Sequence, residues 1–330
     1  MTAVARTGHD ALRAVPQGRR LPDFFILGAP KCGTTTLFAW LAAHPGTWLP
    51  AKEPNFLSPD VVDVRSVPGA LVTWDAYLDR LCPPQADALL TGEATPRYLY
   101  SDLALEVLAR FPRPPRLLIL LRNPIDLVYS LHGQMLKQGD ETEADFARAW
   151  EREIGNHPAA RGSGTGAVDR RLAYPAFGLF ADRVGTVLST FPRDRVMLMI
   201  LEETLAPDPA GSHAAVLRFL GLPTVDCPDL SARNRRAEVG SIRLQGRLSR
   251  LRRRAEPLLR ALGVRKGRGT GIMRLLTRLN RPDGTPPEAM PDDLRARLAA
   301  FFAQDVSRLE GALGRKIEAW RDFSQRNASA

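Results

Sequence analysis

The chain has few cysteines and no long apolar segment, and both shortages restrict what it can be. Its three cysteines, Cys32, Cys82 and Cys227, lie far apart and fit no spacing of a metal site. We therefore expect no metal, and reduced thiols in a cytoplasmic protein. The longest aliphatic run, from Leu117 to Leu121, is far too short to cross a bilayer. Because the first 20 residues hold no apolar core of a signal peptide, we expect no export.

The composition is that of a folded chain. Of the 330 residues, 44% are hydrophobic and 25% are charged, which excludes global disorder and permits a buried core. This length suits one large α/β domain or two small ones. Residues 1–20 are polar and lack periodicity, so we predict a flexible arm there and a single domain over residues 21–330.

Positive charge is concentrated in one stretch, residues 233–281. This stretch contains 16 lysines or arginines against two glutamates, whereas the rest of the chain has 30 basic and 34 acidic residues. Its leucines predict a basic helical segment before the last helix. One interpretation is a solvated basic face. The other is peripheral contact with an anionic membrane, at its inner face, or with an anionic acceptor. Nucleic acid is not expected, because the stretch has no aromatic residue on which bases could stack.

Short apolar runs alternate with helical patterns along the chain. The pattern predicts strands over Phe24–Leu27, Arg116–Leu121 and Val196–Leu201, and helices over Thr34–Ala43, Ile125–Met135, Ser212–Leu220 and Asp292–Leu313. Such alternation is typical of an α/β fold, in which a parallel sheet is flanked by helices on both faces. We expect threonines to cap the first helix. The glycine-rich segment from Gly155 to Val168 is a loop of the kind that borders binding sites.

The segment from Gly28 to Thr36, with the sequence GAPKCGTTT, lies between the first strand and the first helix. Its glycines let the backbone approach an anion, and the amides at the helix start point at that anion. A nucleoside-triphosphate loop has a lysine directly after its second glycine. Here Thr34 follows Gly33, and the lysine is Lys31. The segment therefore predicts a phosphate-binding loop of unusual form, with an ordinary strand-to-helix turn as the alternative.

A second candidate anion site follows the strand that ends at Leu121. Arg122 can offer a bidentate fork to a phosphate, and Ser130 on the next helix can donate a hydroxyl hydrogen. Asn123 and Pro124 turn the chain between them. The alternative is that Arg122 makes a structural salt bridge at the edge of the sheet.

Together the two segments resemble the donor site of sulfotransferases that use 3′-phosphoadenosine 5′-phosphosulfate (PAPS). FFILGAPKCGTTTLFAWLAAHP is similar to the family's 5′-phosphosulfate loop, and RLLILLRNPIDLVYSLHGQM is similar to its 3′-phosphate motif. The most similar branch holds heparan sulfate sulfotransferase domains and bacterial carbohydrate and glycopeptide sulfotransferases. The resemblance covers about residues 21–222 and the last helix. It implies a P-loop-like fold and sulfuryl transfer from PAPS to a hydroxyl or amine.

The resemblance also implies roles for single residues. Lys31 would stabilise the charge that grows on the leaving phosphate. Arg122 and Ser130 would hold the 3′-phosphate of the donor. The residues whose backbone or hydroxyl groups would bind the 5′-phosphosulfate are Cys32, Gly33, Thr34, Thr35 and Thr36.

Two weaker matches concern the chemistry. The segment KEPNFL, from Lys52, resembles the one that carries the family's catalytic glutamate, which makes Glu53 the candidate general base. A surface glutamate paired with Lys52 is the alternative. The segment GEATPRY resembles another family motif, but Ala94 stands where some members have lysine. His132 is a rival base, whereas His44 is expected to support a helix end.

The sequence leaves the acceptor open among glycans, glycolipids, glycopeptides and small natural products. The family's C-terminal basic loop is not recognisable, and Lys266, Arg268 and Arg281 are its only candidates. One rival function is a nucleotide kinase or ATPase, which needs a lysine after Gly33 and an aspartate at a strand end to hold magnesium. The other is non-enzymatic binding of membrane or nucleic acid through residues 233–281.

Overall fold

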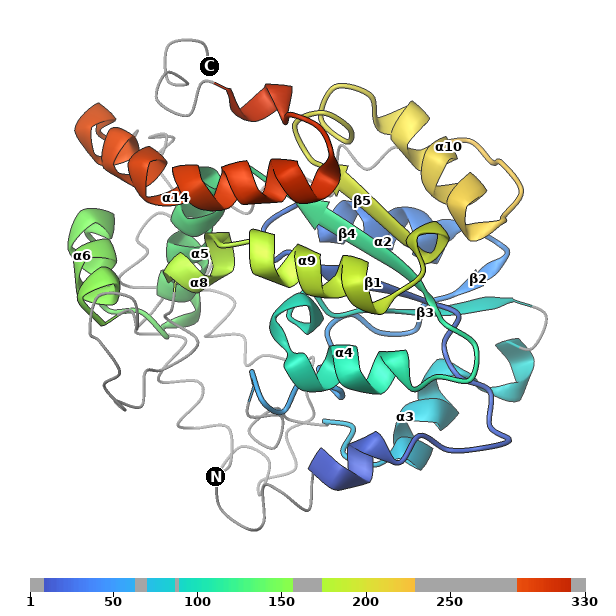
Figure 1. The fold of residues 1–330 in the computed structure, drawn as a ribbon. Coiled ribbons are helices and arrows are strands. Elements are labelled where there is room, and N and C mark those ends of the chain that lie inside the picture. The colour runs from blue at the N-terminus through green and yellow to red at the C-terminus, as the bar shows by residue number, and fades with distance from the viewer. Residues whose placement is uncertain (1–8, 63–69, 87–88, 157–173, 229–289, 322–330) are drawn as a thin grey trace, which may run out of the picture.

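A single five-stranded sheet organises the part of the chain that the computed structural model describes, residues 9–62, 70–86, 89–156, 174–228 and 290–321. Its strands are β1 (Phe24–Gly28), β2 (Thr47–Trp48), β3 (Leu90–Ala94), β4 (Arg116–Leu121) and β5 (Val196–Ile200). They run parallel in the spatial order β2-β3-β1-β4-β5 (Figure 1). The predicted parallel α/β sheet is confirmed.

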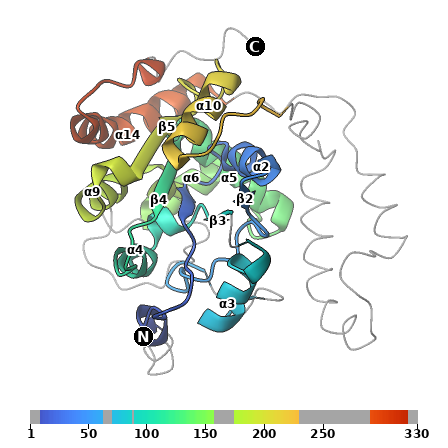
Figure 2. The same ribbon diagram turned by 90° about the vertical axis from the view of Figure 1, so that its right-hand side faces the viewer.

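Helices cover both faces of this sheet. The described α-helices include α2 (Thr34–Ala43), α3 (Trp74–Leu81), α4 (Asp102–Ala109), α5 (Pro124–Gln138), α6 (Phe146–Asn156), α8 (Tyr174–Gly178), α9 (Ala181–Thr190), α10 (Pro209–Leu220) and α14 (Asp292–Leu313). Short 3₁₀ turns are η2 (Pro84–Ala86), η3 (Tyr98–Tyr100), η4 (Arg193–Arg195) and η5 (Glu318–Trp320). Figure 2 shows α4 and α9 on one side of the sheet and α2 on the other. Within the described ranges, no helix is both long and apolar enough to cross a membrane.

The strands with apolar sequences could be predicted from the sequence. β4 matches its predicted bounds and β1 extends one residue beyond them, and all five residues of β1 are buried. β3 was not predicted, because its sequence LTGEA is too polar to indicate a strand. It is held between β1 and β2 all the same. Gly92 is required there, since a Cβ atom at this position would lie 2.3 Å from the ring of Phe24.

Residues 9–20 pack against the domain, where the sequence predicted a loose arm. Leu12 is buried in the core. The Nε of Arg13 donates to Glu106 on α4 at 2.9 Å, and Arg19 lies 2.7 Å from Asp79 on α3. For residues 9–20 the sequence holds little sign of this packing, because one leucine without periodic neighbours does not mark an element.

The terminal helix α14 closes the domain on the predicted apolar face, with Leu298 and Phe302 fully buried. Its Asp305 accepts hydrogen bonds from the backbone amides of Phe180, at 2.7 Å, and Ala181, and so caps α9. Arg295 pairs with Asp126 in the first turn of α5 at 3.0 Å. The basic stretch 233–281 and residues 157–168 of the predicted loop lie outside the described residues.

Candidate functional site

The two predicted anion-binding segments meet at the carboxyl ends of neighbouring strands. Gly28 at the end of β1 pairs with Ile119 of β4, so the loops that follow these strands start side by side. After β1 the chain continues to β2, at one edge of the sheet, whereas after β4 it continues to β5, at the opposite edge. Ligands of open α/β sheets bind in the crevice at such a switch point. The fold therefore brings Lys31 and Arg122 to one switch point, which we call the candidate donor crevice.

The phosphate loop enters α2 through a left-handed residue. Gly33 is the N-cap of α2, with φ of 89°, and no side chain caps this helix start. The expected threonine cap is therefore wrong, because a glycine takes the left-handed position that a threonine disfavours. The first-turn amides of a helix have no partner within the helix. The amide of Thr36 already donates to the carbonyl oxygen of Gly33 at 3.0 Å, so Thr34 and Thr35 are the first-turn residues whose amides can face an anion.

Cys32 contributes only its backbone to this loop. Its side chain is fully buried, and its Sγ lies 3.3 Å from the carbonyl oxygen of Pro30. Burial raises the pKa of the thiol well above its ordinary value, although Arg122 beside it acts in the opposite direction. Cys32 is therefore a small packing residue and not a reactive thiolate.

The threonines of the loop differ in exposure. Thr34 is 4% exposed, whereas Thr35 is exposed and its Oγ1 accepts a hydrogen bond from Nζ of Lys52 at 2.6 Å. The same Nζ lies 3.4 Å from Oε1 of Glu53. The pairing of Glu53 with Lys52 is thus present, but Lys52 also reaches the phosphate loop. The sequence analysis did not predict the contact between Lys52 and Thr35. The only signal in the sequence was that Lys52 is next to Glu53.

Glu53 sits on a strained turn. Within the described chain, the non-glycine residues with positive φ are Lys31 (64°), Glu53 (58°) and Asn55 (54°). Left-handed backbone is costly for such residues and gathers at functional sites. The turn is held by the amide of Glu53, which donates to Ala94 at 2.8 Å, and by Nδ2 of Asn55, which donates to the carbonyl of Glu53 at 2.7 Å.

A buried carboxyl on the adjacent strand β3 supports this turn. Glu93 is fully buried on β3 and accepts hydrogen bonds from the hydroxyls of Tyr77 and of Thr95, the latter at 2.6 Å. The hydroxyl of Tyr98 in turn accepts from the amide of Leu57 at 3.0 Å. Burial raises the pKa of Glu93 to about 7, against the lowering effect of these hydroxyl groups. The polar cluster therefore ties β3 to the segment that carries Glu53.

Arg122 follows β4 and faces Glu202. Its Nε lies 4.0 Å from Oε1 of Glu202, the limit of an ion pair, and its side chain is 22% exposed. Glu202 is fixed by the amide of Asn123 at 2.9 Å and by Nε1 of Trp320 at 3.1 Å. The loose pair leaves Arg122 able to turn its fork to a phosphate. Ser130 lies on α5 and is half-buried.

The two histidines have structural surroundings. The ring of His132 is buried between Phe146 and Tyr174, and its Nε2 is 2.9 Å from the carbonyl of Glu143. Burial lowers its pKa. This enclosure argues against His132 as the rival base. His44 is the C-cap of α2, and its Nδ1 accepts from the amide of Gly46 at 2.9 Å, in line with the predicted support of a helix end.

The requirements of the kinase or ATPase alternative are not met at this crevice. Thr34 occupies the position after Gly33 that would carry the lysine. Arg122, not an aspartate, follows β4. Among the residues that the structure describes, no three histidine, cysteine or acidic side chains group as metal ligands.

Comparisons with known proteins agree with this geometry. Residues 21–237 match the model of the sulfotransferase domain family. The chain is 29% identical over 210 residues to heparan sulfate glucosamine 3-O-sulfotransferase 6 of Mus musculus, which covers 64% of this chain and 55% of that protein. It is 26% identical over 204 residues to the bifunctional heparan sulfate N-deacetylase/N-sulfotransferase 3 of Homo sapiens, over 62% of this chain and 22% of that one.

A solved structure is similar over nearly its whole length. The sulfotransferase from Alicyclobacillus acidocaldarius superposes with a TM-score of 0.63 at 25% identity, covering 92% of this chain and 99% of the other. The curated relatives are longer, so that the match spans about half of the 3-O-sulfotransferase. The family match covers well over half of this chain and contains both candidate anion-binding segments and the Glu53 turn. The chain therefore belongs to the sulfotransferase family.

Proposed function

We propose that the protein transfers a sulfuryl group from PAPS to a hydroxyl or amine of a carbohydrate acceptor. The observation that carries this proposal is the chain of contacts from the phosphate loop to an exposed carboxylate. Lys52 joins Thr35 of the loop, at 2.6 Å, to Glu53, at 3.4 Å. A loop able to bind the donor and a group able to take the acceptor proton are thus adjacent, as group transfer requires.

The residues divide the chemistry between them. The amides at the start of α2 and the hydroxyl of Thr35 would hold the 5′-phosphosulfate. Lys31 would stabilise the negative charge on the leaving phosphate, and Arg122 with Ser130 would hold the 3′-phosphate. The acceptor oxygen or nitrogen would bond to sulfur as the sulfur–oxygen bond to the leaving phosphate breaks. Glu53 would take the acceptor proton, and adenosine 3′,5′-bisphosphate would leave.

A carbohydrate acceptor is supported by the relatives and by the exposure of Glu53. Two of the similar proteins are named as heparan sulfate sulfotransferases, one acting on oxygen and one on nitrogen. The side chain of Glu53 is 45% exposed, so an acceptor larger than the donor can reach it from solvent. Both the hydroxyl and the amine version are consistent with a carboxylate base.

Donor binding and transfer are tested separately. Calorimetry should show adenosine 3′,5′-bisphosphate binding more tightly than ATP with magnesium. Incubation with sulfur-35-labelled PAPS should then label an amino-sugar oligosaccharide in a panel that also holds a glycolipid and a glycopeptide. Tighter binding of ATP with magnesium would contradict the donor assignment. A sugar-free phenol completes the panel, and transfer to this phenol alone would keep the donor assignment and overturn the carbohydrate one.

A further inference from the structure

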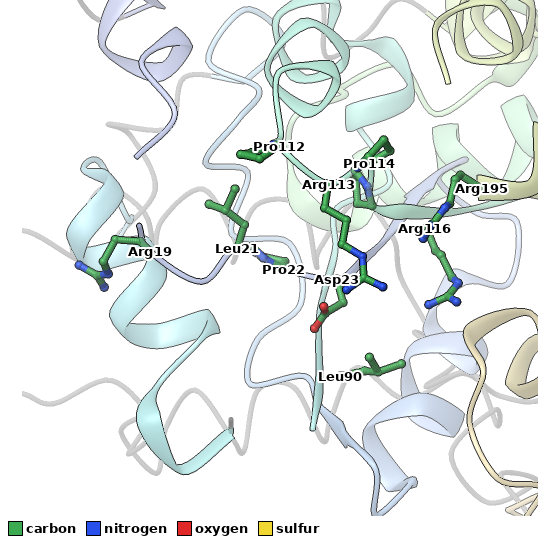
Figure 3. A pocket seen from close by; sticks show the side chains of 11 residues that line it. Arg19, Leu21, Pro22, Asp23, Leu90, Pro112, Arg113, Pro114, Arg116 and Arg195 are labelled. Atoms are coloured by element: carbon green, nitrogen blue, oxygen red, sulfur yellow. The ribbon is translucent and has the colours of Figure 1, made fainter. Parts of the chain in front are cut away.

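A second hollow lies at the opposite, amino-terminal edge of the sheet. It has a volume of about 240 Å³ and is lined by Arg19, Leu21, Pro22, Asp23, Leu90, Pro112, Arg113, Pro114, Pro115, Arg116 and Arg195. Figure 3 shows Arg113 and Arg116 extending toward the same space, with Asp23 beside them. The six residues of β4 separate this edge from Arg122 by about 20 Å. The hollow is therefore outside the candidate donor crevice.

The register of the sheet forces these arginines together. Leu117 of β4 pairs with Val196 of β5, so Arg116 and Arg195, one residue earlier in each strand, adjoin. Arg116 also pairs with Phe24 of β1, and its amide donates to the carbonyl of Asp23 at 2.9 Å. Like charges on adjoining strand positions are destabilising unless something compensates them. Pairing of the hydrophobic strands thus imposes a positive cluster at this edge.

The neighbouring carboxylates offset this positive charge only in part. Asp23 accepts hydrogen bonds from the amide of Thr91 at 2.9 Å and from Arg20 at 3.2 Å. Asp194 lies 3.9 Å from Arg195 and is itself 80% exposed. Within the described chain, neither Arg113 nor Arg116 has a carboxylate oxygen within 4.0 Å, and Arg19 is paired with Asp75 and Asp79.

The repulsion within this cluster changes the pKa of Arg116. Partial burial, together with repulsion from Arg195 and Arg113, lowers the pKa of its guanidinium group, although Asp23 and Asp194 act in the opposite direction. An anion between these side chains would remove the repulsion and accept hydrogen bonds from the guanidinium groups. Three prolines on the rim, Pro112, Pro114 and Pro115, restrict the backbone that carries Arg113 and Arg116. The binding site for such an anion is therefore largely pre-formed.

We propose that this hollow binds a sulfate or phosphate group, through Arg113, Arg116 and Arg195. A planar guanidinium fork can donate to two oxygens of such a tetrahedral group at once. A monovalent halide offers no such pair of acceptors. The volume of about 240 Å³ is below the range of about 300–1,000 Å³ typical of pockets for drug-sized molecules. The hollow therefore takes one charged group, which is either a free ion or the sulfate of a sugar.

Selenate, an analogue of sulfate with a strong anomalous signal, can locate the anion directly. Crystals of the full-length protein soaked in sodium selenate should show an anomalous peak between Arg113 and Arg116. A peak at the phosphate loop reports a separate site and serves as an internal positive control. A crystal with a peak at that loop and none at the hollow, with the hollow free of lattice contacts, overturns the proposal.

Solution binding gives a second, independent test and separates the two sources of the group. Isothermal titration with sodium sulfate or with a glucosamine sulfate, at constant ionic strength, should show a binding step that Arg113→Gln/Arg116→Gln weakens at least tenfold. The control Arg148→Gln removes an arginine that is 78% exposed and outside the hollow. Tighter binding of inorganic sulfate supports a free ion, and tighter binding of the sugar supports a glycan. Equal weakening by the control, or unchanged binding in the double variant, overturns the proposal.

Discussion

The two ends of the same sheet both carry cations, but these cations have different partners. At the carboxyl end, Lys52 lies 3.4 Å from Glu53 and Arg122 lies 4.0 Å from Glu202. At the amino end, Arg113 and Arg116 lie beside each other, with no described carboxylate in ion-pair range. The carboxyl end thus combines acids with bases, whereas the amino end offers an excess of positive charge.

Because of this difference, we expect different roles for the two ends of the sheet. A transfer reaction needs a group that accepts a proton, and at the carboxyl end Glu53, on a strained turn, is the base that we propose. At the amino end the nearest carboxylate, Asp23, is engaged by Thr91 and Arg20. Guanidinium groups stay protonated and do not act as bases. We therefore expect turnover to depend on one end alone, and anion affinity to depend on both.

The largest effect should come from removing the base. Glu53→Gln keeps the shape of the side chain but cannot take a proton, so kcat should fall by roughly 10²- to 10⁴-fold. The affinity for adenosine 3′,5′-bisphosphate should change little. Initial rates with labelled donor and calorimetry measure the two quantities. Glu151→Gln is the control, since Glu151 is 56% exposed and pairs with Arg297. Full activity of Glu53→Gln would place the base elsewhere.

The buried carboxyl below this turn should make stability depend on pH. The pKa of Glu93 rises from 4.5 to about 7 on burial, so the folded protein holds this proton more tightly than the unfolded chain. Its stabilising contribution is complete below pH 4.5 and is lost as the pH rises through about 7. The loss amounts to about 3 kcal/mol. Glu93→Gln should remove this slope from the unfolding free energy, measured by urea titration between pH 4.5 and pH 7.5.

A carboxyl of opposite character provides the control for Glu93. Arg13 donates to Glu106 and lowers its pKa, so its stabilising contribution is present at neutral pH and is lost on acidification. Glu106→Gln should therefore leave the slope between pH 4.5 and pH 7.5 nearly unchanged and remove a slope of opposite sign below pH 4.5, which is small because Glu106 is 37% exposed. Identical slopes in the wild-type protein and Glu93→Gln would show that Glu93 does not titrate in this range.

The sequence predicted the parts of the molecule that depend on local pattern. The apolar runs of β1 and β4 and the loops that follow them are contiguous in sequence, so the positions of both candidate anion-binding segments in the fold could be predicted. β3 could not, because a strand of sequence LTGEA is stabilised by its neighbours and not by its own hydrophobicity. The same holds for the Lys52–Thr35 contact and the Tyr77–Glu93 bond, which depend on how separate segments pack.

A smaller effect is expected from Arg122, the arginine that we propose holds the 3′-phosphate of the donor. Arg122→Ala should weaken the affinity for adenosine 3′,5′-bisphosphate by roughly 10- to 100-fold, since hydrogen bonds to charged groups contribute about 1.5–3 kcal/mol. Arg122→Lys should recover only part of this loss, because lysine lacks the bidentate fork. Calorimetry measures both variants. Arg308→Ala, a change at a side chain that is 54% exposed on α14, is the control. An unchanged affinity in Arg122→Ala would leave Arg122 as a purely structural partner of Glu202.

The smallest effect should come from the amino end, and it tests the comparison most directly. Arg113→Gln/Arg116→Gln should leave kcat and the affinity for the bisphosphate within about twofold, because a screened charge about 20 Å away contributes little at physiological ionic strength. The unfolding free energy should stay equal or rise, since the change removes two mutually repelling charges from one hollow. Rate measurements and urea unfolding, with and without sodium sulfate, check both statements. A large loss of turnover in a folded double variant would mean that the two ends act together, with the hollow holding a remote sulfate of the acceptor while Glu53 acts on another sugar. A loss of stability that sulfate does not change would instead mean that Arg113 and Arg116 stabilise the strand edge by packing.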